Sequence, residues 1–231
     1  VSVVDAISND SFDSLNDQTV TVSTTDNDTA GFTVVQSGGS TSVAESVTTD
    51  TFTVVLNAQP NSNVVISVAS GDTGEATVSP STLTFTSGNW NSAQTVTVTG
   101  VNDNLVDGTQ TSTLTLSVVD GSSDNNFDPV SDQTVSATTT DNDTAGFTVV
   151  QSGGSTSVAE SGSTDTFTVV LDAQPTSNVV ISVASGDTGE ATVSPATLTF
   201  TSGNWNSTQT VTVTGVNDNL VDGTQTSTLT L

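Results

Sequence analysis

The chain has 231 residues and contains no lysine, arginine, histidine or cysteine, so its 25 acidic residues give a net charge of −25. With no cation to neutralise phosphate, nucleic acid and anionic membrane surfaces are excluded as partners. No apolar run approaches the roughly 20 residues of a membrane span, so we expect no membrane insertion.

Between residues 29 and 143 the predicted elements are all β-strands. Short runs alternate β-branched or aromatic residues with Thr and Ser, which is typical of strands with one apolar and one wet face. In chain order the predicted strands are Phe32–Gln36, Thr41–Glu45, Asp50–Leu56, Asn63–Ala69, Glu75–Val78, Thr82–Thr86, Gln94–Thr99, Thr109–Val119 and Gln133–Thr139. Turn signals separate them at short spacing, and no window has a helical apolar stripe. The pattern predicts an all-β fold of immunoglobulin-like, Greek-key β-sandwich type.

The sequence repeats itself with an offset of 115 residues. Residues 29–116 differ from 144–231 at six positions, and the exchanged residues are small or polar except Val47. Residues 1–28 match 116–143 with twelve differences. A period this long suits a whole domain that buries its own core. We therefore expect residues 1–28 to be the last strands of a preceding or donor repeat, 29–143 a complete β-sandwich, and 144–231 a second β-sandwich lacking its last strands.

Two features of the repeat have two interpretations each. Trp90 and Trp205, the only tryptophans, are expected to close one end of a core, and the alternative is a platform on which a sugar stacks. The irregular stretch Asp120–Asp132 is expected to be a solvated hairpin loop, and the alternative is a functional loop.

Acidic residues gather where predicted strands end. The sequence Val-Asn-Asp-Asn-Leu-Val-Asp-Gly covers Val101–Gly108 and recurs at Val216–Gly223, and Asp-Asn-Asp occurs at Asp26–Asp28 and Asp141–Asp143. Alternating Asp and Asn present several hard oxygens on a tight loop, which is the ligand set that Ca²⁺ prefers. The alternative is that these residues only make turns, because their side chains bond their own backbone.

These motifs, together with Val-Ala-Glu at Val43–Glu45, resemble those of Calx-β domains over the whole 115-residue period. In that family the matching acids bind calcium at one end of the sandwich, near the junction with the next domain. The resemblance implies Ca²⁺ as a cofactor and the following ligands: Glu45, Asp72, Asp103, Asp107, Asp141 and Asp143 in the first full repeat, Glu160, Asp187, Asp218 and Asp222 in the second, and Asp26 and Asp28 in the preceding one. Gly108 and Gln110 stand where the family often has further glutamates, which implies weak, extracellular-range affinity.

The absence of His, Cys, Lys and Tyr removes most catalytic groups, so we expect no enzyme. Carboxylate pairs can hydrolyse glycosides, but duplication of every pair points to an array. Two functions remain: a structural repeat of a secreted, cell-surface stalk, fibre or filament like those of large bacterial adhesins, or an adhesive module that binds a glycan or cell-surface ligand. The scarcity of aromatic residues favours the first.

The phase of the repeat predicts how units join. Val1 and Leu231 both correspond to Leu116, inside a predicted strand. Either the chain is an internal segment of a longer polypeptide, or Val1–Asp28 of one chain completes the open sandwich of another by strand addition. Both predict neighbouring repeats or identical chains as partners, arranged head-to-tail.

Overall fold

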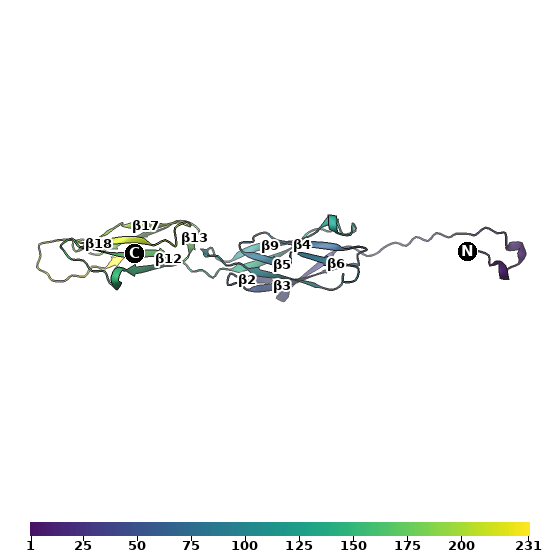
Figure 1. Ribbon diagram of the computed structural model, residues 1–231, viewed down its shortest axis with the longest axis horizontal. Helices are drawn as coiled ribbons and strands as arrows, with labels where there is room; N and C mark the ends of the chain where they lie inside the picture. The colour runs from purple at the N-terminus through teal and green to yellow at the C-terminus, as the bar shows by residue number, and fades with distance from the viewer.

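The computed structural model describes residues 1–231 apart from the side chain of Asp5. Two β-sandwiches lie end to end along the long axis of the molecule, and the N-terminal segment extends away from the first of them (Figure 1). We refer to residues 29–143 as repeat 1 and to residues 144–231 as repeat 2. Residues 1–31 contain two short 3₁₀ turns, η1 (Asp5–Ile7) and η2 (Asp10–Phe12), and no strand. The all-β, sandwich-type fold class is confirmed.

Repeat 1 consists of two sheets, and its strands from β1 to β7 alternate between them, whereas β9 and β10 lie side by side in the second sheet. The first sheet has the order β1-β3-β7-β5, formed by Phe32–Gln36, Thr49–Leu56, Gln94–Gly100 and Ala76–Ser79. The second has the order β2-β10-β9-β4-β6, formed by Thr41–Ala44, Gln133–Thr140, Gln110–Val118, Val64–Ser70 and Thr82–Phe85. All nine predicted strands are present, with ends within one residue of the prediction. β10 pairs parallel with β2 and antiparallel with β9, so it fills the position between them.

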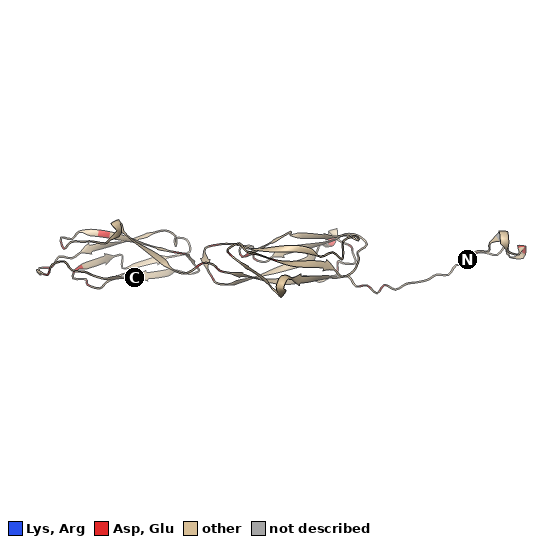
Figure 2. Cartoon of the chain, turned by 90° about the horizontal axis from the view of Figure 1, so that it is seen from below, with Lys and Arg blue, Asp and Glu red and all other residues tan. Residues whose placement is uncertain are grey.

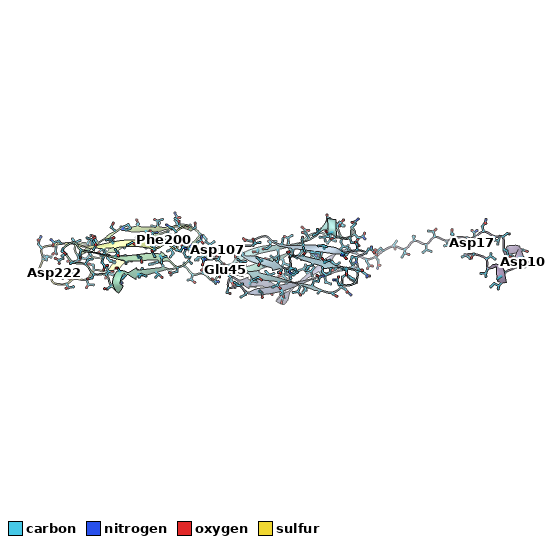
Figure 3. All side chains as sticks on the ribbon, viewed as in Figure 1. Asp10, Asp17, Glu45, Asp107, Phe200 and Asp222 are labelled. Carbon is cyan, nitrogen blue, oxygen red and sulfur yellow. The ribbon has the colours of Figure 1, made fainter. Side chains whose placement is uncertain are left out.

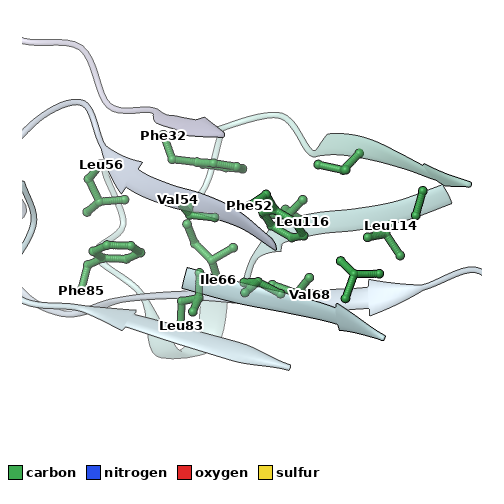
Figure 4. Close-up of a cluster of buried hydrophobic side chains, with 14 of the residues drawn as sticks. Phe32, Phe52, Val54, Leu56, Ile66, Val68, Leu83, Phe85, Leu114 and Leu116 are labelled. Atoms are coloured by element: carbon green, nitrogen blue, oxygen red, sulfur yellow. The ribbon is translucent and has the colours of Figure 1, made fainter. Parts of the chain in front are cut away.

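The core of repeat 1 lies between the two sheets (Figure 4). Strict alternation along the strands places every second residue inside, as in β3, where Phe52, Val54 and Leu56 are buried. Phe85, Ile66 and Leu116 enter the same core from the opposite sheet, as Figure 4 shows. Burial of such side chains stabilises the fold by about 1.5–3 kcal/mol each, which explains a stable domain without a disulfide.

The connection between β9 and β10 differs from its prediction. It contains the 3₁₀ turn η4 (Asp120–Ser122), and its centre is not solvated, because Asp124 and Phe127 are both buried. The Asp124 carboxylate accepts hydrogen bonds from the backbone N–H groups of Asn61 (2.7 Å) and Ser62 (3.0 Å). The loop thus closes the end of the sandwich opposite the second repeat. Trp90, partly buried, packs against the core, as expected.

Repeat 2 retains the first sheet but not the second. The order β11-β12-β18-β16, formed by Phe147–Gln151, Thr164–Leu171, Gln209–Gly215 and Ala191–Ser194, repeats that of β1-β3-β7-β5. The other face has only two short pairs: β14 (Val179–Ser182) with β17 (Thr197–Phe200), and β15 (Ala184–Ser185) with β19 (Leu229–Thr230). A second core forms around Phe167 and Phe200, with Trp205 packed against it.

Two glycine turns, η3 (Ser37–Gly39) and η5 (Ser152–Gly154), occupy equivalent places after β1 and β11. Acidic residues are scattered along loops and strand ends with no basic residue beside them (Figure 2). Within the described part of the chain, no helix has the length and hydropathy needed to span a membrane.

Candidate metal site

Two glutamates are buried at the end of repeat 1 that faces repeat 2. Glu45 follows β2 and is 1% exposed, and its backbone N–H donates to the Thr140 carbonyl on β10 (3.1 Å). Glu75 directly precedes β5 and is 8% exposed. Its carbonyl accepts hydrogen bonds from Val101 N–H (2.8 Å) and the Thr139 hydroxyl (3.3 Å). Both sheets thus fix a carboxylate at this end.

The loop between β7 and β9 supplies further acids. Asp103 makes a local turn, in which its Oδ1 accepts from the backbone N–H of Leu105 (2.7 Å). Asp107 and Gly108 donate their backbone N–H groups to Oδ2 of Asp141, at 3.1 and 2.8 Å. Gly108 has φ of +74°, a left-handed conformation that favours glycine and that lets both N–H groups point to one oxygen.

The Asp-Asn-Asp segment after β10 closes over this loop. Asp141 Oδ1 accepts from the backbone N–H of Asp143 (2.6 Å), and the N–H of Asn142 approaches Glu45 Oε2 (3.4 Å). The Asn142 side chain donates to the Asn102 side chain (2.8 Å), which ties the segment to the loop. Segments about 100 residues apart in sequence therefore meet at one point.

The result is a cluster of carboxylates made of two groups of three, and the ligand oxygens within each group lie within 4.8 Å of one another. Glu45 belongs to two such groups, one with Asp141 and Asp143 and one with Glu75 and Asp107. Three oxygens of the cluster are buried without any hydrogen-bond partner: Glu75 Oε2, Asp107 Oδ1 and Asp143 Oδ2. Since the chain has no basic side chain, no protein cation can compensate these charges. We refer to these five residues as the junction cluster.

The electrostatics of the junction cluster oppose ionisation. Burial raises the pKa of Glu75 above its ordinary value of 4.5, and the charges of Asp107 and Asp103 raise it further. Burial also raises the pKa of Glu45 and of Asp143. The pKa of Asp141 is lowered instead, because backbone N–H groups of Asp143 and Gly108 stabilise its charged form. A cation placed among these oxygens would offset both the burial and the repulsion.

The predicted ligands of repeat 1 divide into two groups. Glu45, Asp107, Asp141 and Asp143 come together in the junction cluster. Asp103 lies near enough for its charge to raise the pKa of Glu45, but its Oδ1 is engaged in its own turn. Asp72 lies outside the cluster, where its Oδ1 accepts from Gly74 N–H (2.9 Å). It therefore fits the turn interpretation.

Glu75 belongs to the cluster but was not among the predicted ligands. Its neighbours in sequence are those of a strand start, and only the fold brings it opposite Glu45. One signal pointed to it: Glu75 and Glu45 are the only glutamates in repeat 1, and both recur in repeat 2 as Glu190 and Glu160. Because glutamate occurs at the same two positions in both repeats, Glu75 is as good a candidate ligand as Glu45.

Repeat 2 has the corresponding cluster in a more open form. Ligand oxygens of Glu190, Asp218 and Asp222 lie within 4.8 Å of one another, and burial raises the pKa of Glu190. Glu160 is half-buried and adds its charge to that of Glu190, as does the turn residue Asp187. Asp26 and Asp28 are exposed on the N-terminal segment and belong to neither cluster.

The junction cluster lies next to the contact between the repeats. Figure 3 shows Glu45 and Asp107 at the end of repeat 1 facing repeat 2, and Asp222 at the far end of repeat 2. A two-residue strand of the acidic loop, β8 (Leu105–Val106), pairs parallel with β13 (Gln174–Pro175) of repeat 2. The Gln174 N–H donates to the Asn104 carbonyl at 2.7 Å. The loop that contributes Asp107 to the cluster is thus also the loop that holds repeat 2.

No family model and no curated protein matches the sequence. Among solved structures, the apo-form CBD1 domain of Calx is similar over 48% of this chain and 98% of its own, with 13% identity and a TM-score of 0.35. SSP-19, an MSP-domain-like protein of Caenorhabditis elegans, covers 46% of this chain and 97% of its own at 13% identity and TM-score 0.31. The E. coli chaperone DraB covers 82% of this chain and 89% of its own at 7% identity and TM-score 0.36. At these values the matches assign no function to the chain.

Proposed function

We propose that the chain is a structural repeat array of an extracellular stalk or filament, in which calcium binds at the junction cluster and stiffens the connection between repeats. The observation that carries the proposal is the set of three buried, unpartnered oxygens of Glu75, Asp107 and Asp143. An uncompensated buried charge destabilises a fold by several kcal/mol, so a cluster of them without any cation partner calls for a bound ion.

The donor set fits calcium. All members of the junction cluster are carboxylates, and Asn102 and Asn142 lie beside them. Ca²⁺ takes six to eight such hard oxygens in flexible geometry, whereas Mg²⁺ demands a near-ideal octahedron and keeps several waters. Zinc and copper prefer nitrogen or sulfur ligands, and the chain has neither histidine nor cysteine. Calcium would supply positive charge and no catalytic chemistry here.

The position of the cluster gives the ion a mechanical role. Asp141 and Asp143 belong to the segment that leads into repeat 2, and Asp107 belongs to the loop whose Leu105–Val106 strand pairs with repeat 2. An ion held by both segments would fix the linker against the loop. A ligand that binds only one form of a protein stabilises that form, and the stabilisation grows with the ratio of ligand concentration to dissociation constant, so calcium would favour the stiff form of the junction.

We also propose an extracellular location and a non-catalytic role, which the same features support. Weak calcium sites are filled where calcium is millimolar, outside the cell. The cluster offers no nucleophile beyond carboxylates, and no basic group accompanies them. Trp90 and Trp205 pack against the two cores, which supports the stalk rather than a glycan-stacking surface.

Small-angle X-ray scattering of the 231-residue chain tests the proposal, with calcium, with magnesium at equal ionic strength, and with chelator. We expect calcium alone to narrow the distribution of inter-repeat distances and to lengthen the maximum dimension of the monomer. The same distribution in all three solutions would overturn the proposal, because the junction would then be equally stiff without the ion.

A further inference from the structure

The second strand and the last strand of repeat 1 lie side by side in one sheet. The chain enters the repeat before β1, at the end opposite repeat 2, and leaves it after β10 through Asp141–Asp143 (Figure 1). β2 is the edge strand of the second sheet, and within that sheet it pairs only with β10. Thr41–Ala44 of β2 lie alongside Ala137–Thr140 of β10, and the two strands run parallel. We refer to these two strands as the terminal pair.

The parallel direction decides how a pulling force acts on the terminal pair. Tension along the array reaches β2 from its N-terminal side, through β1, and reaches β10 from its C-terminal side, through Asp141. In a parallel pair these two sides lie at opposite ends, so the tension slides one strand along the other and loads all their hydrogen bonds together. Tension applied to the same end of both strands would instead break these bonds one after another.

Backbone and side-chain hydrogen bonds both join the two strands. The Glu45 N–H, directly after β2, donates to the Thr140 carbonyl of β10 (3.1 Å). The Thr138 hydroxyl donates to the Thr41 carbonyl (3.5 Å), and the Thr140 hydroxyl donates to the Val43 carbonyl (3.4 Å). Each of these bonds links β2, or the residue after it, to β10, so sliding of the strands strains all of them.

The other edge of β2 is bonded within its own hairpin. The N–H of Ser42 donates to Asp50 Oδ2 (2.9 Å), and the N–H of Ala44 donates to Thr48 Oγ1 (2.7 Å). Backbone groups of successive strand residues point to opposite edges, so the N–H of Val43 is directed at β10.

The terminal pair is shielded from water. Every second residue along it is buried: Thr41, Val43 and Glu45 on the side of β2, and Val135, Ala137 and Thr139 on β10. A hydrogen bond in such a place is electrostatically stronger than one in water. The Gln133 side chain also donates to the Phe32 carbonyl, which joins the start of β10 to the first residue of β1.

We propose that the terminal pair is the mechanical clamp of repeat 1. The hydrogen bonds between β2 and β10 carry tension along the array, and the repeat stays folded until they break together. The inference extends the proposed function, because a stalk or filament is loaded along its axis, but the clamp itself does not depend on calcium. An ion held by Glu45, Asp141 and Asp143 would reinforce it, because Glu45 follows β2 and the two aspartates follow β10.

Single-molecule force spectroscopy of the 231-residue chain in chelator tests the inference. The chain has no cysteine, so two introduced cysteines fix the points of attachment. Thr29→Cys with Thr144→Cys, both at exposed positions, pulls repeat 1 in the direction of the array. Ser46→Cys with Thr144→Cys pulls the terminal pair apart from one end. We expect a several-fold lower unfolding force in the second geometry, because the bonds then break singly.

A substitution within the pair separates mechanical strength from stability, because forced unfolding is governed by the unfolding rate. Val43→Pro removes the N–H directed at β10 and should lower the unfolding force in the array direction. Leu83→Ala opens a cavity beside β6, at the far edge of the same sheet. It should lower the midpoint of thermal unfolding but leave the unfolding force close to that of the wild type.

Equal unfolding forces in the two geometries would overturn the inference. A Leu83→Ala variant that loses as much force as Val43→Pro would also overturn it, because the resistance would then be spread over the whole core. If Val43→Pro does not fold, the two geometries still decide, since their cysteines lie outside both strands. All of these measurements are made in chelator, so they succeed or fail independently of calcium binding at the junction cluster.

Discussion

Glu45 and Glu75 present carboxylate oxygens within 4.8 Å of each other, although neither has a cation partner and both are almost fully buried. They come from opposite sheets: Glu45 follows β2, and Glu75 precedes β5. The pairing is unfavourable for a calcium-free fold and favourable for a calcium-bound one. Substitution of Glu75 and a change of pH should therefore affect stability differently in calcium and in chelator.

Glu75→Gln should have opposite effects with and without calcium. In chelator, the substitution removes a buried, repelled charge and should raise the midpoint of thermal unfolding. In calcium, it removes a ligand and should weaken binding about tenfold or more, measured by titration calorimetry. Asp72→Asn is the comparison, because it removes a charge near Glu75 without removing an oxygen of the cluster. A variant that binds calcium as tightly as the wild type would exclude Glu75 as a ligand.

The stability of the calcium-free chain should fall as the pH rises above the ordinary carboxyl pKa of 4.5. Glu45, Glu75, Asp143 and Glu190 have raised pKa values, so the folded state binds more protons than the unfolded state above their ordinary values of 3.8 to 4.5. Asp124 and Asp141, whose pKa values are lowered, contribute stability that is lost only below about 3.8, outside this range.

With calcium the trend should reverse, because the ion must displace those protons and binds more tightly as the pH rises. Unfolding midpoints at several pH values, in chelator and in calcium, give both slopes. Slopes of the same sign in the two solutions would contradict ionic occupation of the cluster.

Asp124→Ala should destabilise repeat 1 by about 1–3 kcal/mol, because it removes a buried carboxylate that accepts hydrogen bonds from the backbone N–H groups of Asn61 and Ser62. Chemical denaturation, followed by Trp90 fluorescence in a Trp205→Phe background, reports on this repeat. Asp120→Ala, an exposed position in the same loop, should change stability by less than about 0.5 kcal/mol. Equal effects of the two substitutions would mean that the loop is not anchored by Asp124.

Gln174→Pro should loosen the contact between repeats, because proline removes the N–H that donates to Asn104. Small-angle scattering in calcium should show a broader distribution of inter-repeat distances than the wild type. Gln59→Pro is the matched control: Gln59 occupies the same place in repeat 1, and its backbone N–H makes no hydrogen bond within the described chain. Identical scattering of Gln174→Pro and wild type would place the stiffness elsewhere.

Alternation in the sequence predicted the strands of repeat 1 because each strand buries one face. Apolar residues then recur at every second position, as Phe52, Val54 and Leu56 do in β3. It could not predict β8 and β13, since Leu105–Val106 and Gln174–Pro175 pair across the repeat boundary and carry no alternating pattern. The burial of Asp124 was equally hidden, because its backbone partners lie 62 and 63 residues away.

For the candidate site, motif spacing identified the acids of the loop and of Asp-Asn-Asp. It also included Asp72, which lies outside the cluster and whose Oδ1 accepts a hydrogen bond within a turn, and it did not include Glu75. An aspartate that makes a turn and an aspartate that binds a metal have the same local sequence, and only the fold, which brings acids from both sheets together at one end, distinguishes them. The buried oxygens without a hydrogen-bond partner, which favour a metal, arise because these acids meet there.

Thermal unfolding of the 231-residue chain in calcium, compared with magnesium at equal ionic strength, is the sharpest test of calcium binding at the junction cluster. We expect a calcium-specific rise in the unfolding midpoint that grows with calcium concentration over the millimolar range, beyond any shift caused by magnesium. Equal midpoints in calcium and magnesium at every concentration would contradict it, and would leave an acidic β-sandwich spacer whose aspartates serve only to make turns.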